Sequence, residues 1–179
     1  MLRGLLSPVL MATMVGPVGA AQARPAGGWQ VQTRQSAMDD SKTVVLMLKA
    51  DQEIVGWLKK HRPALFLRCK EGNAEAFIAT GTPPSVEIGN HDGATVRFRY
   101  DKEEAVIVSA SKDTAGKSLF LPNPAFHIQS MLEHERLLFE FTPFNASPQT
   151  TIFTLRGLAQ VVEPLQDACG LEWMKPGQD

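Results

Sequence analysis

Four histidines are the side chains best able to hold a metal ion or move a proton: His61, His91, His127 and His134. His127 and His134 are seven residues apart, so on one helix their Cα atoms would lie about 10.5 Å apart. Zinc binds each ligand nitrogen at about 2.0–2.1 Å, so these two cannot share an ion without unusual reach. His61 and His91 fall in separate predicted loops, and no HExxH motif occurs. We predict no metal site and no cofactor.

Hydrolytic chemistry has little support in the sequence. No G-x-S-x-G motif occurs, and no serine stands out as a nucleophile. The adjacent acids Asp39 and Asp40 would point opposite ways on an extended chain, which does not suit a paired-carboxylate mechanism. Ser36 and Ser41 flank them and favour a tight turn closed by side-chain hydrogen bonds, with calcium binding as the alternative. We predict no catalytic residue and no enzyme, and an exported cell-wall hydrolase or toxin stays the alternative.

Gly116-Lys117-Ser118 resembles the end of a phosphate-binding loop. That motif requires a glycine at position 111, where this chain has Ser111. The residues that follow, Leu-Phe-Leu-Pro, do not open a helix whose N-terminus could face a phosphate. We therefore expect an exposed turn here.

The charge balance argues against a nucleic-acid partner. The chain has 18 basic and 19 acidic residues, and its basic residues form only small groups such as Lys59–Arg62. Trp57 lies beside that group. It could anchor a partner, because tryptophan is enriched at binding hot spots, while packing in the core is the somewhat favoured alternative.

Residues 1–23 have the pattern of a secretory signal peptide. Arg3 is followed by the apolar run Leu5–Gly19 and by Ala21-Gln22-Ala23, a typical cleavage pattern. The apolar run is shorter than the ~20 residues that a transmembrane helix needs. We expect an exported domain with no transmembrane segment after cleavage.

Export makes a disulfide between Cys69 and Cys169 the default expectation. Alternation in Ala64–Lys70 places Cys69 on an apolar strand face. Apolar spacing of three and four over Leu158–Cys169 places Cys169 on the apolar stripe of a helix. Both sulfur atoms should face the same interior, and two buried free thiols are the alternative.

The sequence predicts a mainly β (α+β) protein, an antiparallel β-sandwich-like domain with two short helices in its C-terminal third. Helices are expected from Asn123, as N-cap, to near His134 and over Leu158–Cys169, with a kink or restart at Pro164. The expected units are residues 24–28 as a flexible tether, 29–173 as one β-rich domain and 174–179 as a tail. Strands are expected over 29–34, 43–49, 64–70, 75–80, 85–88, 95–101, 105–111, 136–142 and 150–156.

Several short blocks also follow one order along the chain. They are Trp29, Ser36-Ala37-Met38-Asp39-Asp40-Ser41 leading into residues 43–46, Leu67-Arg68-Cys69, residues 153–158 and Ala168-Cys169-Gly170. This order resembles the VasI/TagO-type accessory proteins of the bacterial type VI secretion system. The resemblance spans nearly the whole chain after the signal peptide.

The resemblance implies a periplasmic accessory or assembly protein of the Gram-negative envelope, without enzymatic activity. Its partner would be a protein or a peptidoglycan-associated component. An exposed strand edge or the Trp57 region is the expected contact, and Asp39 and Asp40 are further candidate contacts. A small enzyme inhibitor is another alternative, which a protruding loop at Gly81–Ser85 would favour.

Overall fold

The computed structural model describes residues 27–85 and 93–171. The predicted signal peptide, His91, most of the strand predicted over 85–88 and the predicted C-terminal tail lie outside these residues. No helix in the described ranges is long and apolar enough to cross a bilayer.

The fold is mostly β, as predicted, and every pair of neighbouring strands is antiparallel. Within the described residues, one sheet has nine strands, and a hairpin of two short strands forms a second sheet. In spatial order the large sheet consists of β1 (Gln30–Gln35), β2 (Lys42–Lys49), β5 (Ala64–Lys70), β6 (Asn73–Ala79), β9 (Ser118–Phe120), β8 (Val106–Lys112), β7 (Gly93–Tyr100), β10 (Arg136–Phe141) and β11 (Gln149–Thr154). The small sheet consists of β3 (Ile54–Val55) and β4 (Lys60–His61).

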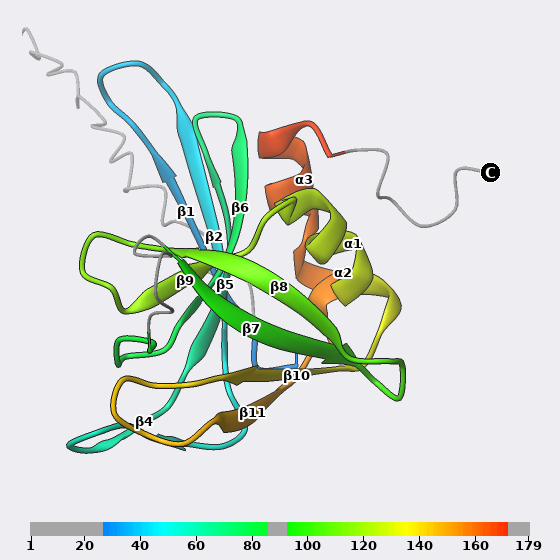
Figure 1. The fold of residues 1–179 in the computed structure, drawn as a ribbon. Coiled ribbons are helices and arrows are strands. Elements are labelled where there is room, and N and C mark those ends of the chain that lie inside the picture. Colours follow the sequence, from blue (N-terminus) through cyan, green and yellow to red (C-terminus); the bar gives the residue numbers. More distant parts are fainter. Residues whose placement is uncertain (1–26, 86–92, 172–179) are drawn as a thin grey trace, which may run out of the picture.

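The large sheet bends on itself around β9. This strand pairs with β6 through Phe77↔Phe120 and with β8 through Ser111↔Phe120. Figure 1 shows β7, β8, β10 and β11 crossing β1, β2, β5 and β6 steeply, so that the two halves face each other like the layers of a sandwich. The core lies between these halves.

Alternation along the strands fills that core. On β7, Val96, Phe98 and Tyr100 are buried, whereas Arg97 and Arg99 are exposed on the outer face. Such alternation is expected of a sheet with one wet face. The strand predicted over 95–101 is therefore confirmed.

The two ends of the sheet are joined by hydrogen bonds. The indole of Trp29 is buried and donates to the Leu155 carbonyl at 3.2 Å, and the Asp51 amide donates to the Ile152 carbonyl at 2.8 Å. Gly27, expected in a tether, forms a turn at φ 59°, where an added Cβ would lie 1.8 Å from the Arg156 carbonyl oxygen. The chain is thus already packed on the domain at Gly27.

Three helices cover one side of the sandwich: α1 (Pro124–Glu133), α2 (Leu158–Val161) and α3 (Glu163–Cys169). The predicted second helix is divided into α2 and α3 at Val162, which confirms the restart expected at Pro164. Asn123 occupies the N-cap of α1 as predicted. It has left-handed backbone at φ 50°, and its side chain makes no capping hydrogen bond.

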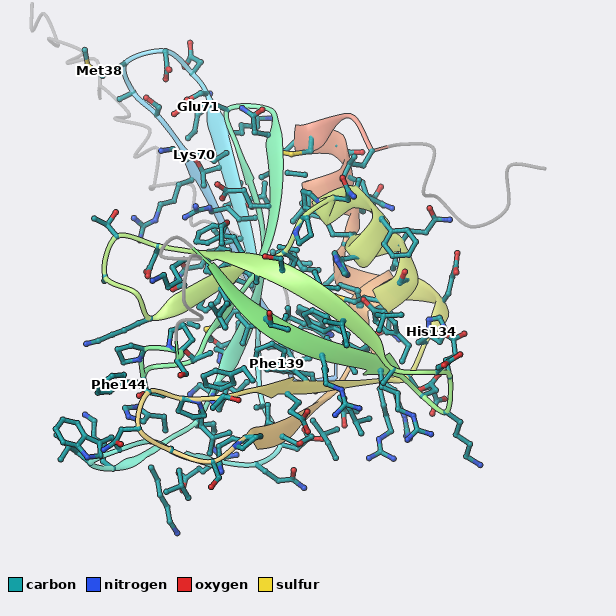
Figure 2. The ribbon with its side chains drawn as sticks, viewed as in Figure 1. Met38, Lys70, Glu71, His134, Phe139 and Phe144 are labelled. Carbon is teal, nitrogen blue, oxygen red and sulfur yellow. A yellow bond between two sulfur atoms is a disulfide. The ribbon has the colours of Figure 1, made fainter. Side chains whose placement is uncertain are left out.

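The predicted disulfide is present and joins β5 to α3. Cys69 and Cys169 are bonded across 100 residues of sequence, with their Cα atoms 5.7 Å apart. Figure 2 shows the bond beside α3. It fastens the last helix onto β5, the third strand of the large sheet.

Candidate interaction surface

His127 is a buried side chain of α1. It is 4% exposed, and its Nδ1 lies 3.2 Å from the Tyr100 hydroxyl. The rings of Phe98 and Phe126 lie 5.5 and 5.6 Å from the imidazole. Burial lowers the pKa of His127 and raises the pKa of Tyr100. The imidazole is therefore neutral at pH 7 and is out of reach of a substrate in this conformation.

His134 is the C-cap residue of α1. Its Nδ1 lies 2.6 Å from the Ser130 carbonyl oxygen and its Nε2 lies 3.0 Å from Glu103 Oε1. These two acceptors, the Ser130 carbonyl first, raise the pKa of His134. Across residues 27–85 and 93–171, no three His, Cys, Asp or Glu side chains gather closely enough to hold a metal ion.

The predicted turn at Asp39 is confirmed. Asp39 Oδ1 accepts hydrogen bonds from the Ser41 amide at 3.2 Å and the Ser41 hydroxyl at 2.8 Å, while the Met38 amide donates to the Ser36 hydroxyl oxygen at 3.2 Å. Hydrogen bonds from Ser36 and Ser41 lower the pKa of Asp39. Asp40 has left-handed backbone at φ 56°. Both acids are exposed, and their contact with a partner stays a prediction.

The Gly116-Lys117-Ser118 segment is a turn closed by a carboxylate. Asp113 Oδ1 accepts the Lys117 amide at 2.7 Å and the Ser118 amide at 3.1 Å. In a phosphate loop such amides would face the phosphate oxygens. Here the chain's own aspartate occupies them, which supports the exposed-turn interpretation.

Trp57 lies on the surface, so the favoured expectation of core packing is wrong. The turn between β3 and β4 is closed by a hydrogen bond from the Gly56 amide to the Lys59 carbonyl at 3.0 Å, and it presents Trp57 at 59% and Leu58 at 83% exposure. Phe144 is 52% exposed, and its ring centroid lies 6.1 Å from that of the Trp57 indole in an edge-on arrangement. We name Val55, Trp57, Leu58 and Phe144 the aromatic tip.

Neighbouring segments hold the aromatic tip in place. The Val55 amide donates to Gln149 Oε1 at 3.0 Å, and the Phe144 amide donates to the Pro83 carbonyl at 2.8 Å. Pro84 and Pro143 form an isolated antiparallel bridge. The Gly81–Ser85 loop is therefore bonded to residues 142–144 rather than protruding freely, so the feature that would favour an inhibitor is not seen.

The second candidate surface is the edge of β8. Only Ser111 and Lys112 of this strand pair with β9, whereas Val106–Ser111 pairs with β7 on the other side. The side of Val106–Ala110 that faces away from β7 pairs with no described strand. We name it the open edge of β8; sequence reasoning did not locate it, because the neighbours of a strand depend on the topology.

Hollows are also present on the described part of the chain. One of about 310 Å³ adjoins the open edge of β8 and is lined by Ser109, Ala110, Ser111, Phe120, Leu121 and Pro122, together with Gly93. Another, of about 600 Å³, lies over the outer face of β1, β2 and β5, where Arg34, Arg68 and Lys70 make its lining cationic. Arg68 is already paired with Glu75 and lies over the Phe77 ring.

Comparison with known proteins shows a likeness of fold. No family model matches the sequence, and no curated protein matches it. The crystal structure of invasion associated protein B from Bartonella henselae is similar, with a TM-score of 0.50 and 12% sequence identity over 84% of this chain and 97% of that chain. At this identity the likeness shows a shared fold alone, and no evidence for a type VI secretion family accompanies it.

Proposed function

We propose that this chain is an exported, non-enzymatic accessory protein that binds an extended segment of an envelope protein along the open edge of β8. The observation that carries the proposal is that the backbone of this edge pairs with no strand among residues 27–85 and 93–171. Peptide groups at an edge strand are ready to pair with another chain, and many binding modules take an extended segment in this way.

The direction of the β8 amides supports this mode of binding. The Asp113 amide donates to the Ser118 carbonyl at 3.1 Å and so points toward β9. Amide directions alternate along an antiparallel strand, so those of Ile107 and Ser109 point the same way, beyond the end of β9. A partner strand would meet both amides and both carbonyls in register.

Side chains around the open edge of β8 add a place for the partner's own side chains. Val106 and Ile107 are exposed, with Ile107 at 72%. The adjoining hollow of about 310 Å³ has Phe120 and Leu121 in its wall. Apolar contact there would add to the main-chain hydrogen bonds, which alone carry little sequence preference.

The proposal has two further parts: the chain is exported, and it serves a type VI secretion system. The Cys69–Cys169 disulfide is compatible with an oxidising compartment such as the periplasm. The link to a type VI apparatus rests on the order of motifs in the sequence. The genes that flank this one test that link, because the proposal expects components of a contractile secretion machine beside it.

A proline at position 109 tests the binding mode. Ser109→Pro removes an amide that points to the open edge, and the β7–β8 bonds stay intact because a proline is tolerated at an edge strand where its nitrogen faces outward. Losing one hydrogen bond of about 1 kcal/mol, together with the steric block by the ring, should weaken partner binding at least tenfold. The measurement is recovery of cross-linked envelope proteins with the purified chain.

Ser109→Thr is the matched control. It keeps the amide and suits a strand, so it should recover the same partner as the unaltered chain. Equal recovery with Ser109→Pro, in protein whose thermal midpoint is unchanged, would rule out pairing along this edge. Recovery of no envelope component by any variant would count against the binding function itself.

A further inference from the structure

All four side chains of the aromatic tip are more than half exposed. Trp57 and Leu58 lie at the apex of the β3–β4 turn, and Phe144 adds a second ring from the neighbouring turn. Ile54, one residue before the exposed part of the hairpin, is buried and fixes its base in the core. A contiguous exposed apolar cluster marks a surface that contacts a partner or a membrane.

The charges around the aromatic tip are positive. Lys59 and Lys60 follow its apex and are exposed. The pKa of His61 is lowered by burial and then by the positive charges of Lys59 and Lys117. The Lys117 carbonyl accepts the Thr80 amide at 2.9 Å, and the next residue, Gly81, lies against the His61 ring. In the part of the chain that the structure describes, none of these three lysines forms an ion pair.

The neighbouring acid does not neutralise them. Glu53 lies 3.9 Å from Arg62, whose guanidinium also donates to the carbonyls of Ala50 and Asp51 at 3.1 and 3.0 Å. Arg62 and Glu53 thus form a structural pair at the base of the hairpin. The lysines are left to attract an anionic occupant.

The shape of the aromatic tip favours a membrane over a protein. A standard protein interface takes about 20–30 residues from each partner and buries its hot spots within a dry centre. Here the exposed apolar surface consists of four side chains: Trp57 and Leu58 on one turn, Val55 on β3 and Phe144 on the neighbouring turn. A fluid surface can receive such a projection without a matching pocket, and Trp with Lys is the usual pairing at the level of lipid headgroups.

We propose that the aromatic tip docks this protein on an anionic phospholipid surface. Trp57 and Leu58 enter the headgroup region, while Lys59, Lys60 and Lys117 contact lipid phosphates. The docking uses residues different from the open edge of β8, so it goes beyond the proposed function and does not depend on it.

Vesicle binding of the full mature chain tests the docking. Vesicles of phosphatidylcholine with about 30% phosphatidylglycerol should bind it at least tenfold more tightly than phosphatidylcholine alone, because each lysine near an anionic surface contributes about fivefold in affinity. Lys59→Ala with Lys60→Ala should then lose about 25-fold. Leu58→Glu should abolish sedimentation with the vesicles. Brominated acyl chains should quench the tryptophan fluorescence of the unaltered chain more than that of the Trp57→Phe variant.

Met38→Glu is the matched control. Met38 is 95% exposed at the turn between β1 and β2, and Figure 2 places it at the opposite end of the molecule from Phe144. This variant should bind vesicles like the unaltered chain. Equal binding to both vesicle types, or full binding by a folded Leu58→Glu variant, would overturn the proposal. Loss of a cross-linked protein with Leu58→Glu, without any vesicle binding, would assign the aromatic tip to a protein instead.

The two proposals fail separately. Leu58→Glu should still recover the β8 partner, and Ser109→Pro should still bind vesicles. Failure of vesicle binding alone therefore leaves the envelope-protein partner standing, and failure of partner recovery alone leaves the membrane contact standing.

Discussion

Breaking the Cys69–Cys169 bond should cost this protein much of its stability while leaving the fold in place. The bond joins β5 to α3, and Cys69 is fully buried. Reduction changes the covalent link and leaves both side chains in place, Cys69 in the core and Cys169 partly buried against it. It therefore isolates the effect of the cross-link from the effect of an emptied site.

The expected size follows from the length of the closed loop. The two cysteines are 100 residues apart, and a loop of about that length lowers the free energy of the folded state relative to the unfolded chain by about 4.7 kcal/mol in the chain-entropy model. Domains of this size are stable by about 5–15 kcal/mol in total. At about 2–4 °C per kcal/mol, reduction should lower the melting temperature by about 10–20 °C.

Thermal and urea unfolding followed by circular dichroism, with and without a phosphine reductant, measures this difference. Mass spectrometry after thiol labelling confirms the redox state of each sample. The Cys69→Ser, Cys169→Ser double variant should unfold near the reduced midpoint and should not respond to reductant. If the fully reduced protein melted within about 2 °C of the oxidised one, the reasoning from loop closure would be refuted.

Two histidines give pH predictions of opposite sign. The pKa of His134 is raised by the Ser130 carbonyl and by Glu103, so the stability that its protonated form adds is present below about pH 6.5 and is lost as pH rises through the folded-state pKa. The difference in melting temperature between the unaltered chain and His134→Gln should therefore be larger at pH 5.5 than at pH 8. The same difference at both pH values would refute this prediction. Burial lowers the pKa of His127, so the folded chain loses stability as pH falls below about 6.5 toward that lower pKa. In melting curves recorded from pH 7 to pH 5, the His127→Phe variant should lose less melting temperature than the unaltered chain. An equal fall of melting temperature with pH in both proteins would contradict this role of His127.

Much of the fold could be predicted where a residue's environment repeats along the chain. The alternation of Val96, Phe98 and Tyr100 sufficed because each buried position implies the next two residues away. Pro164 predicted the division of the last helix, since the missing amide has a local effect. The disulfide was predictable because both cysteines lie on apolar faces with a regular period.

Short elements were missed for the opposite reason. β9 has three residues, and β3 and β4 have two each, so none is long enough to show a period. β9 is nevertheless the strand around which the sheet bends. The position of β9 is set by its pairing with β6 on one side and with β8 on the other, not by a pattern within its own three residues.

The candidate surfaces also lay beyond sequence reasoning. The sequence did not decide whether Trp57 is buried or exposed, because a single tryptophan in a turn belongs to no repeating pattern of apolar residues. Val106-Ile107-Val108 is a run of apolar residues typical of a buried strand, yet Val106 and Ile107 are exposed. Among the described strands, β8 has a neighbour along its whole length on one side only, which the strand order of the sheet decides, and this arrangement leaves both side chains exposed.

Site-specific photocross-linking in the native cell tests the central claim most directly. A photoreactive residue at position 107 lies on the open edge of β8, and one at position 160 lies on α2, where Gln160 is exposed. A discrete adduct with an envelope protein is expected from position 107 and none from position 160, in chain that has been exported. No adduct from position 107, or the same adducts from both positions, would contradict the central claim.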